Sequence, residues 1–378
     1  MIQISTVLFK TKKGNTMRRF ITLSICLCLF FAIVLLIAYV YGENTSLKEG
    51  KDYLVICRDG GVGAYEAFPD ICRIPDGRLL CVFYDGYTHV SLPNEEHPKG
   101  GRISGIFSSD EGKTWGEPFV IYDSFYDDRD PSITVIDGKK LICNFFSLKP
   151  AENQNERWEG LGTWIICSED WGKTWSESKQ IFPEYYCSSP IRTLPDGTLI
   201  MSLYGREQGN GAVSFSNDKG LTWSKPIDVP IGDLKLDSEP DVCVLKNQNL
   251  FMAQRGRSSE PMGFSLSADG GRTWSISKPL NFPGHCPYLH RAPSGVLLMG
   301  IRYPKNGTYM SVSTDEAATW CEPLLVDPCR GAYPSMVTLK DNSILVVYYE
   351  EGNGSNLRAR KFTVTPEGKV EWVLWTNE

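Results

Sequence analysis

The chain has 378 residues, 42% of them hydrophobic, and a formal net charge of −6 at pH 7. It is long enough to bury a substantial core. Because several of its basic residues gather before residue 20, the remainder is more acidic than the total charge indicates. An acidic globular part argues against nucleic acid as a partner.

The first elements in chain order are a basic segment, residues 1–19, and an uncharged apolar segment, residues 20–41. The apolar segment is long enough to span a bilayer. The basic residues before it predict a cytoplasmic N-terminus and an external remainder. A cleaved secretory signal that starts at Met17 is the alternative. Under both interpretations residues 42–52 form a linker, and the domain at 53–378 lies outside the cytoplasm, membrane-anchored or secreted.

From residue 69 onward the sequence repeats a unit of strand, tight turn and strand six times. Each unit starts at a proline and turns at Asp-Gly or a similar pair, which is typical of a hairpin. The second strands of the units are strongly apolar. They are expected at residues 79–84, 141–146, 199–204, 250–253, 296–301 and 344–349.

A second repeat, S-x-D-x-G-x-T-W, follows most of these units. Clean copies are expected to form hairpin turns, since the aspartate can accept downstream amide hydrogen bonds and the glycine supplies a positive φ. The tryptophan then enters the next strand as an apolar plug between layers. The clean copies begin at Ser108, Ser168, Ser216 and Ser267, and a fifth, at Ser313, carries Ala317 in place of glycine. We expect Ala317 to destabilise its turn, because alanine tolerates positive φ poorly.

Six such units predict an all-β fold, a six-bladed β-propeller with four strands, A to D, in each blade. The Asp-Gly turns join strands A and B, and the S-x-D-x-G-x-T-W turns join strands C and D. The sixth unit lacks the second repeat; residues 357–364 and 370–375 can supply its outer strands. Residues 53–57 are the alternative partner there and would close the ring.

If both kinds of turn share one face, the opposite face carries the starts of the A strands and the B–C loops. The central opening of a propeller on that face is the expected ligand site. A strands contribute polar residues there, namely Glu66, Arg129, Asp130, Glu239, His285 and Tyr333. The B–C loops contribute Asp85, Tyr87, His89, Arg206, Glu207, Arg255, Arg257, Arg302, Lys305, Glu350 and Glu351.

Arginines, carboxylates and aromatic residues gathered at one central opening suit an oxygen-rich, anionic ligand. The planar fork of arginine binds a carboxylate at two points, and carboxylates can accept hydroxyl hydrogen bonds or move protons. The alternative is that these charges pair with one another and join the blades around the axis. No paired C-x-x-C spacing indicates zinc, and no cofactor is expected. Cys321 and Cys329 flank a short loop and could form a disulfide.

The S-x-D-x-G-x-T-W copies, or Asp-boxes, together with the six units, resemble the sialidase superfamily of BNR-repeat propellers over roughly residues 53–375. The resemblance implies that Glu239, in Ser-Glu-Pro at the start of the fourth blade, activates the nucleophile. It implies that Arg255 binds the substrate carboxylate. Tyr333, in Ala-Tyr-Pro-Ser before the apolar strand that ends in Tyr349-Glu350, is implied as the covalent nucleophile.

The chain departs from the family pattern at three positions. The first-blade arginine of the family falls at Ala67. The third arginine falls near Arg302 or Lys305. The acid aspartate falls near His97, where this chain has no aspartate; Asp85, His89 and Asp130 are the candidates to replace it.

Four functions are compatible with these observations. The leading one is an exported sialidase-like exo-glycoside hydrolase that acts on a terminal sugar, which can be acidic, with a tyrosine nucleophile and a glutamate base. A glycan-binding propeller without catalysis is the second. A structural or protein-docking propeller is the third. A lyase that acts on an acidic sugar through Tyr333 and His285 is the fourth.

Overall fold

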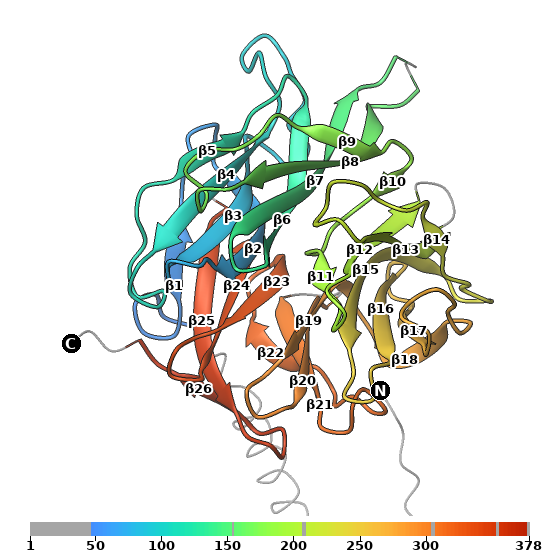
Figure 1. Ribbon diagram of the computed structural model, residues 1–378. Helices are drawn as coiled ribbons and strands as arrows, with labels where there is room; N and C mark the ends of the chain where they lie inside the picture. Colours follow the sequence, from blue (N-terminus) through green and yellow to red (C-terminus); the bar gives the residue numbers. More distant parts are fainter. Residues whose placement is uncertain (1–46, 153–154, 206–208, 304–306, 353–354, 376–378) are drawn as a thin grey trace, which may run out of the picture. The chain divides into compact units, whose positions relative to one another are not determined.

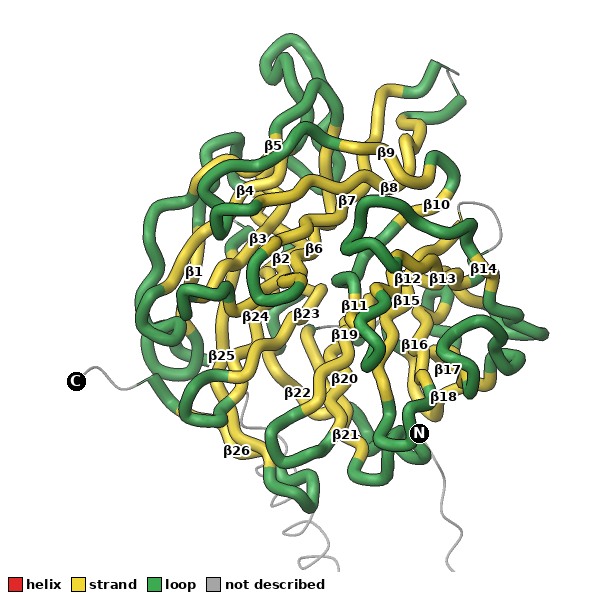
Figure 2. Tube along the Cα trace, viewed as in Figure 1, coloured by secondary structure: helices red, strands yellow, loops and turns green. Residues whose placement is uncertain are grey.

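The computed structural model describes residues 47–152, 155–205, 209–303, 307–352 and 355–375. The predicted basic and apolar segments, Arg206 and Lys305 lie outside these residues. The described residues contain strands, turns and loops and no helix, so none of them forms a helix that could cross a membrane. Figure 2 shows the strands in yellow, joined by green loops.

Six antiparallel sheets are arranged as the blades of a propeller, as predicted (Figure 1). The first blade comprises β2 (Tyr65–Arg73), β3 (Leu79–Gly86), β4 (Arg102–Ser108) and β5 (Phe119–Tyr122). The second comprises β6 (Asp127–Ile136), β7 (Lys140–Pro150), β8 (Trp158–Ser168) and β9 (Lys179–Phe182). In the third, the inner strand is split into β10 (Tyr185–Tyr186) and β11 (Arg192–Thr193), followed by β12 (Leu199–Gly205), β13 (Gly211–Ser216) and β14 (Ile227–Asp228).

The remaining blades repeat the same order. The fourth comprises β15 (Leu236–Val244), β16 (Leu250–Gly256), β17 (Pro261–Ser267) and β18 (Lys278–Pro283). The fifth comprises β19 (His285–Arg291), β20 (Leu297–Arg302), β21 (Thr308–Ser313) and β22 (Leu324–Asp327). The sixth comprises β23 (Gly331–Thr338), β24 (Ile344–Glu350), β25 (Leu357–Val364) and β26 (Val370–Val373).

Both predicted ways of completing the sixth blade occur together. Strand β26 pairs with one half of β25, through Lys361–Val364. Strand β1 (Leu54–Cys57), from the other end of the domain, pairs with the other half of β25, through Leu357–Ala359. The first and last parts of the propeller therefore lie side by side, and the ring is closed by the chain's own backbone hydrogen bonds (Figure 1).

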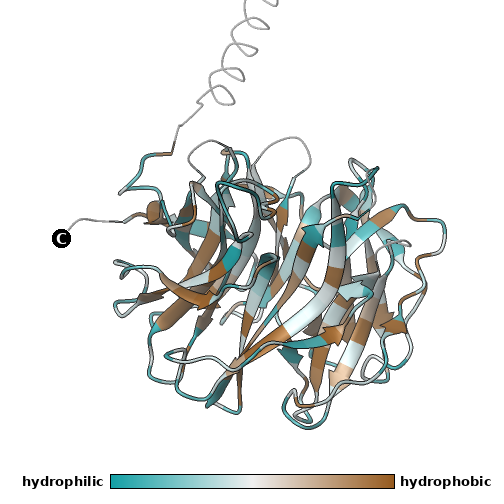
Figure 3. Cartoon of the chain, turned by 90° about the horizontal axis from the view of Figure 1, so that it is seen from above, coloured by the Kyte–Doolittle hydropathy of each residue, from teal (hydrophilic) through white to brown (hydrophobic). Residues whose placement is uncertain are grey.

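The core of the propeller lies between neighbouring blades. The second strand of each blade alternates its side chains between two interfaces: Leu79, Cys81 and Phe83 pack toward the sixth blade, whereas Leu80 and Val82 pack toward the second. Both faces of these strands are buried, which explains why their sequences read as continuous apolar runs. In Figure 3 the brown, hydrophobic residues accordingly lie along the strands, and many of the loops are teal.

The S-x-D-x-G-x-T-W turns join the third and fourth strands of five blades. In the first of them, Asp110 accepts hydrogen bonds from the Thr114 amide (2.9 Å) and the Thr114 hydroxyl (2.6 Å), and the Gly112 amide donates to Ser108 (2.9 Å). Trp115 packs into the interface with the preceding blade. The predicted turn and the predicted plug are both confirmed.

Replacing Ala317 by glycine is expected to raise the free energy of unfolding by about 0.5–1 kcal/mol, measured by urea denaturation. Ala317 holds a φ of 65° in the fifth copy of the turn, and a left-handed conformation costs an L-residue about 1–2 kcal/mol, part of which the entropy of glycine offsets. The matched control is Gly112→Ala, which should destabilise, since its Cβ would lie 2.8 Å from Leu345. A destabilised Ala317→Gly variant would contradict this account.

Candidate active site

Five of the six inner strands carry the same bulge at the same level. In each, a residue and the proline after it lie opposite a single residue of the second strand, because proline has no amide hydrogen to donate to the ladder. The residue before the proline adopts a positive φ of 39–53°, which is rare for non-glycine residues. These residues are Phe68, Asp130, Glu239, Cys286 and Tyr333.

The bulges turn the five side chains toward the centre of the propeller. Asp130, Glu239 and Tyr333 line a pocket of about 670 Å³. Phe68 and Cys286, together with Asp130 and Tyr333, line a small cavity of about 20 Å³. Backbone strain of this kind costs about 1–3 kcal/mol per residue and clusters at functional sites.

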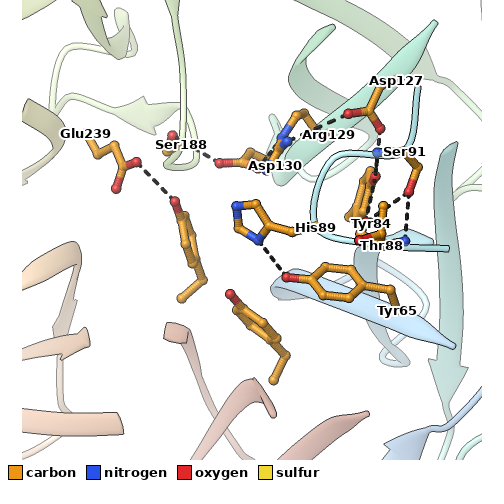
Figure 4. Close-up of polar contacts among 12 residues, drawn as sticks. Tyr65, Tyr84, Thr88, His89, Ser91, Asp127, Arg129, Asp130, Ser188 and Glu239 are labelled. Atoms are coloured by element: carbon orange, nitrogen blue, oxygen red, sulfur yellow. Dashed lines mark hydrogen bonds and ion pairs between the residues drawn. The ribbon is translucent and has the colours of Figure 1, made fainter. Parts of the chain in front are cut away.

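Tyr333, Glu239 and Arg255, which the sequence singled out from three positions far apart in the chain, meet in this pocket. The Tyr333 hydroxyl donates to Glu239 Oε1 at 3.0 Å (the tyrosine joined to Glu239 by a dashed line in Figure 4). Arg255 Nη1 donates to the same oxygen at 2.6 Å. Among the described residues, Glu239 Oε2 is buried without a hydrogen-bond partner. The second carboxylate oxygen is therefore free to accept a proton.

The electrostatics of this group keep the proton on the tyrosine while the pocket is empty. Burial alone would raise the pKa of Glu239, but the charges of Arg255 and Arg302 and the hydrogen bonds that Glu239 accepts hold its pKa below the usual value. Burial and the neighbouring Glu239 charge raise the pKa of Tyr333 well above 10. At neutral pH the pair is consequently a carboxylate that accepts a hydrogen bond from a protonated phenol.

Three arginines line the pocket together with Tyr333. Tyr333 acts on the pKa of Arg129, Arg255 and Arg302, and all three line the pocket. Arg129 lies over the ring of Phe68, 5.0 Å from its centroid. Although Ala67 stands where the family has its first-blade arginine, the second blade thus supplies an arginine beside the same bulge. Arg257 and Arg330 add two more guanidinium groups to the lining.

Asp130, a predicted catalytic residue, lies in the same ring of bulges. Its carboxyl group contacts Arg129 Nε at 3.4 Å and Ser188 Oγ at 3.5 Å. Burial raises its pKa to about 6, although the Arg129 charge opposes this shift. Asp130 is therefore in a position to contact a bound ligand.

One side of the pocket is aromatic and was not predicted from the sequence. Phe146, Tyr186 and Tyr204 line it, together with Trp158 from the extended hairpin between β7 and β8. Asp237 and Glu351 were also absent from the principal candidates, yet both line the pocket. The unusual length of the second and third strands of blade two was the available signal for Trp158, because longer strands project beyond their neighbours.

Two predicted site residues of the first blade do not reach the pocket. Asp85 is fully buried and accepts hydrogen bonds from Arg102 (2.9 Å), Ser104 (2.8 Å) and the Val62 amide (3.1 Å). Its prediction as a catalytic residue is wrong, because it is enclosed in a structural ion pair. Glu66, which we predicted to bind substrate, is fully buried and accepts the Gly60 amide at 2.9 Å.

Two further predictions are corrected at the fifth and sixth blades. His285 does not line the pocket, since its ring nitrogens contact Arg302 (3.1 Å) and the Ser258 carbonyl (2.8 Å). Through these contacts His285 positions Arg302. Because both ring nitrogens of His285 already have partners, the structure does not favour the lyase in which His285 would act on the substrate. Glu350 turns away to Arg358 and Asn356, and the next residue along the chain, Glu351, faces the pocket instead.

The predicted disulfide is also wrong. Cys321 and Cys329 are both free, as are the eight other cysteines within the part of the chain that the structure describes.

Glu66→Gln is expected to stabilise the protein at pH 9 by about 1–3 kcal/mol, the cost of a buried polar group without a partner, and to leave stability at pH 5 nearly unchanged. Burial raises the pKa of Glu66 to about 8. A carboxyl group with a raised pKa stabilises the fold below its unfolded pKa, and this contribution is lost as the pH rises toward 8. Thermal midpoints at both pH values test this, with exposed Glu117→Gln as the control. Equal effects of Glu66→Gln at the two pH values would refute it.

The sequence matches the model of the BNR repeat-like domain over residues 95–285, which is 191 of its 378 residues. The chain belongs to the BNR repeat-like domain family. This BNR repeat-like protein is a divergent, sialidase-like member. A sialidase of Paraclostridium sordellii is 24% identical over 250 residues, 57% of this chain and 59% of the relative. A sialidase of Clostridium perfringens is 23% identical over 279 residues, 64% of this chain and 69% of that relative.

Solved structures share the fold of this BNR repeat-like protein. A protein of unknown function from Dyadobacter fermentans has a TM-score of 0.71 at 20% identity, covering 82% of this chain and 97% of that one. The NanB sialidase of Streptococcus pneumoniae has a TM-score of 0.65 at 13% identity, covering 83% and 71%. An intramolecular trans-sialidase of Ruminococcus gnavus has a TM-score of 0.63 at 13% identity, covering 83% and 97%. The match to the first curated relative spans about three fifths of that relative's length.

Proposed function

We propose that this protein is an exported exo-glycoside hydrolase that removes a terminal, acidic sugar from glycans, with Tyr333 as the nucleophile and Glu239 as its base. The observation that carries the proposal is the hydrogen bond from Tyr333 to Glu239, enclosed with Arg255 in an axial pocket. Export rests on the sequence of residues 20–41. The curated relatives are sialidases, which favours a sugar that carries a carboxylate.

The charge balance of the pocket supports an anionic substrate. Five arginines and four carboxylates line it among the described residues, and His89 is also present. Arg302 lies beside Tyr333, and its donor groups could bind a carboxylate at two points. Moving a charged ligand out of water costs free energy unless the site offers an opposite charge. We therefore expect these arginines to make the pocket bind an acidic sugar more tightly than a neutral one.

An acidic substrate would also activate the base. In the free protein, Arg255 holds the pKa of Glu239 down through a 2.6 Å ion pair. A substrate carboxylate that shares Arg255 weakens this effect, and the pKa of Glu239 then rises. Glu239 is thereby a stronger base toward Tyr333 when the acidic sugar is bound than when the pocket is empty.

A glycan-binding propeller without hydrolysis is the second candidate. The observation that favours it is the enclosure of Asp85 in its ion pair with Arg102, which removes one predicted proton donor from the pocket.

Incubation of the purified protein with 3′- and 6′-sialyllactose distinguishes the two candidates. Release of the acidic sugar, detected by mass spectrometry, supports hydrolysis. Binding of the same glycans without release, measured by calorimetry, supports the second candidate. If neither binding nor release is detected, the proposal of an acidic-sugar site in this pocket is rejected.

A further inference from the structure

His89 lies in the loop between β3 and β4, and its side chain is half exposed where it lines the pocket. In Figure 4 its ring lies between Tyr65 on one side and Glu239 on the other. Edge-on contacts with Phe68 (centroids 5.6 Å apart) and Tyr65 (5.8 Å) fix the ring orientation. The imidazole is therefore held in one place although it lies on a loop.

One ring nitrogen of His89, Nδ1, is in a hydrogen bond with Tyr65. Nδ1 lies 2.6 Å from the Tyr65 hydroxyl, which itself donates to Glu351 Oε1 at 3.0 Å. Because the hydroxyl has a single hydrogen and donates it to Glu351, Nδ1 must carry a hydrogen and donate it to Tyr65. The Glu351 carboxylate also lies 3.7 Å from Nδ1.

Glu351 remains ionised over the range in which a histidine titrates. Although burial would raise its pKa, hydrogen bonds with His89, Tyr349 and Tyr65 and the His89 charge bring it to about 2. Tyr349 donates to its second oxygen at 2.7 Å. Tyr65, Tyr349 and Glu351 thus form a hydrogen-bonded, negatively charged group beside the imidazole.

The other ring nitrogen, Nε2, faces the pocket. In Figure 4 it is turned toward Asp130 and the tyrosine that donates to Glu239, and the His89 charge acts on the pKa of Asp130. In the described part of the chain, no side chain or carbonyl is recorded in a hydrogen bond with Nε2. The hydrogen of a protonated ring at this position is therefore available to a ligand.

We propose that His89 is the general acid of the reaction, and that Nε2 protonates the oxygen of the departing glycan. This inference rests on the proposed function. As the bond between the anomeric carbon and the glycosidic oxygen breaks, Nε2–H gives its proton to that oxygen. Tyr333 Oη bonds to the anomeric carbon and loses its proton to Glu239. In the second step neutral His89 takes a proton from water, the resulting hydroxide displaces Tyr333, and Glu239 returns the proton to the phenolate.

Position favours His89 over Asp130 for this role. Asp130 is 4% exposed and lies in the ring of bulges with Glu239 and Tyr333. A group at that depth contacts the bound sugar ring. The departing glycan must extend out of the pocket toward solvent, and His89, whose side chain is 52% exposed, lies on that side.

The dependence of the rate on the leaving group tests the inference. We expect His89→Gln to lower kcat/KM by about 10²–10³-fold on the methyl α-glycoside of N-acetylneuraminic acid, which needs a proton donor. On the 4-nitrophenyl α-glycoside, whose leaving group departs without one, the loss should stay below about tenfold. His97→Gln in the same loop, outside the pocket lining, is the matched control and should leave both rates unchanged.

Equal losses on the two glycosides would overturn the role of His89, since a distorted loop or weaker binding affects both substrates alike. A leaving-group-dependent loss in Asp130→Asn and not in His89→Gln would assign the acid to Asp130 instead. If the wild-type protein hydrolyses neither glycoside, the proposed function itself fails, and the inference fails with it. Turnover of the 4-nitrophenyl glycoside by the wild type separates the two failures.

Discussion

Tyr333→Phe is expected to lower kcat by about 10³-fold or more, since removing a nucleophile leaves only the contribution of binding and electrostatics. Glu239→Gln should lower kcat by about 10²–10⁴-fold, the usual contribution of a general base. Both changes keep the shape of the side chain. Tyr333→Phe removes the hydrogen bond between the two side chains, 3.0 Å long, and Glu239→Gln replaces the carboxylate by an amide that cannot serve as the base. Steady-state kinetics on the 4-nitrophenyl glycoside measures both effects.

Tyr122→Phe is the matched control for these variants. Tyr122 donates or accepts one hydrogen bond with Ser178 (2.8 Å) between the first two blades, away from the pocket lining. Its loss should leave kcat unchanged. If Tyr333→Phe retained the wild-type kcat while its thermal midpoint was normal, Tyr333 could not be the nucleophile.

Asp241→Ala is expected to lower the free energy of unfolding by about 3–5 kcal/mol, because it leaves a buried charge without its partner. Asp241 is fully buried in the fourth blade. It accepts two hydrogen bonds from Arg192 of the third blade and one from the Leu289 amide (2.7 Å) of the fifth. A single carboxylate therefore joins three blades.

Urea denaturation of Asp241→Ala measures this effect. Glu371→Ala, which breaks an exposed pair with Lys369 at the edge of the sixth blade, is the control and should have no measurable effect. A loss for Asp241→Ala no larger than that of the control would contradict the assignment of Asp241 as the link between blades.

The interpretation of the axial charges as links between blades therefore holds for some of these residues, whereas others line the pocket. The residue just after the proline of an inner strand, such as Asp70 or Asp241, accepts a hydrogen bond from a neighbouring blade. The residue just before it, such as Asp130 or Glu239, faces the pocket. Two positions along the strand separate a structural charge such as Asp241 from one that lines the pocket such as Glu239, and the bulge between them turns the two side chains in different directions.

The fold could be predicted from the sequence because its signals are local and repeated. Turn residues such as Asp110 and Gly112 specify a hairpin by their own chemistry, and six copies specify a ring. The bulges could also have been predicted. A proline within each inner strand cannot donate to the ladder, and Tyr333-Pro334 and Glu239-Pro240 marked the break.

The errors arose where a side chain could point in one of two directions. Glu350 and Glu351 are adjacent at the end of β24, and only the register of the last strand pair decides which of them faces the pocket. Asp85 could not be excluded from sequence, because its partner Arg102 lies 17 positions further along the chain, on the next strand. Arg129 likewise reaches Phe68 from a different blade, a contact that only the packing of the two blades creates.

The claim that Tyr333 is a nucleophile is tested most directly by trapping the covalent intermediate. The protein is mixed with the 2,3-difluoro derivative of N-acetylneuraminic acid, whose fluoride leaves without a proton donor and whose second fluorine slows breakdown of the intermediate. Peptide mapping by mass spectrometry should find the sugar on the peptide that contains Tyr333, and Tyr333→Phe should remain unlabelled. A sugar attached to a different residue, or no adduct in a preparation that hydrolyses the 4-nitrophenyl glycoside, would contradict the account.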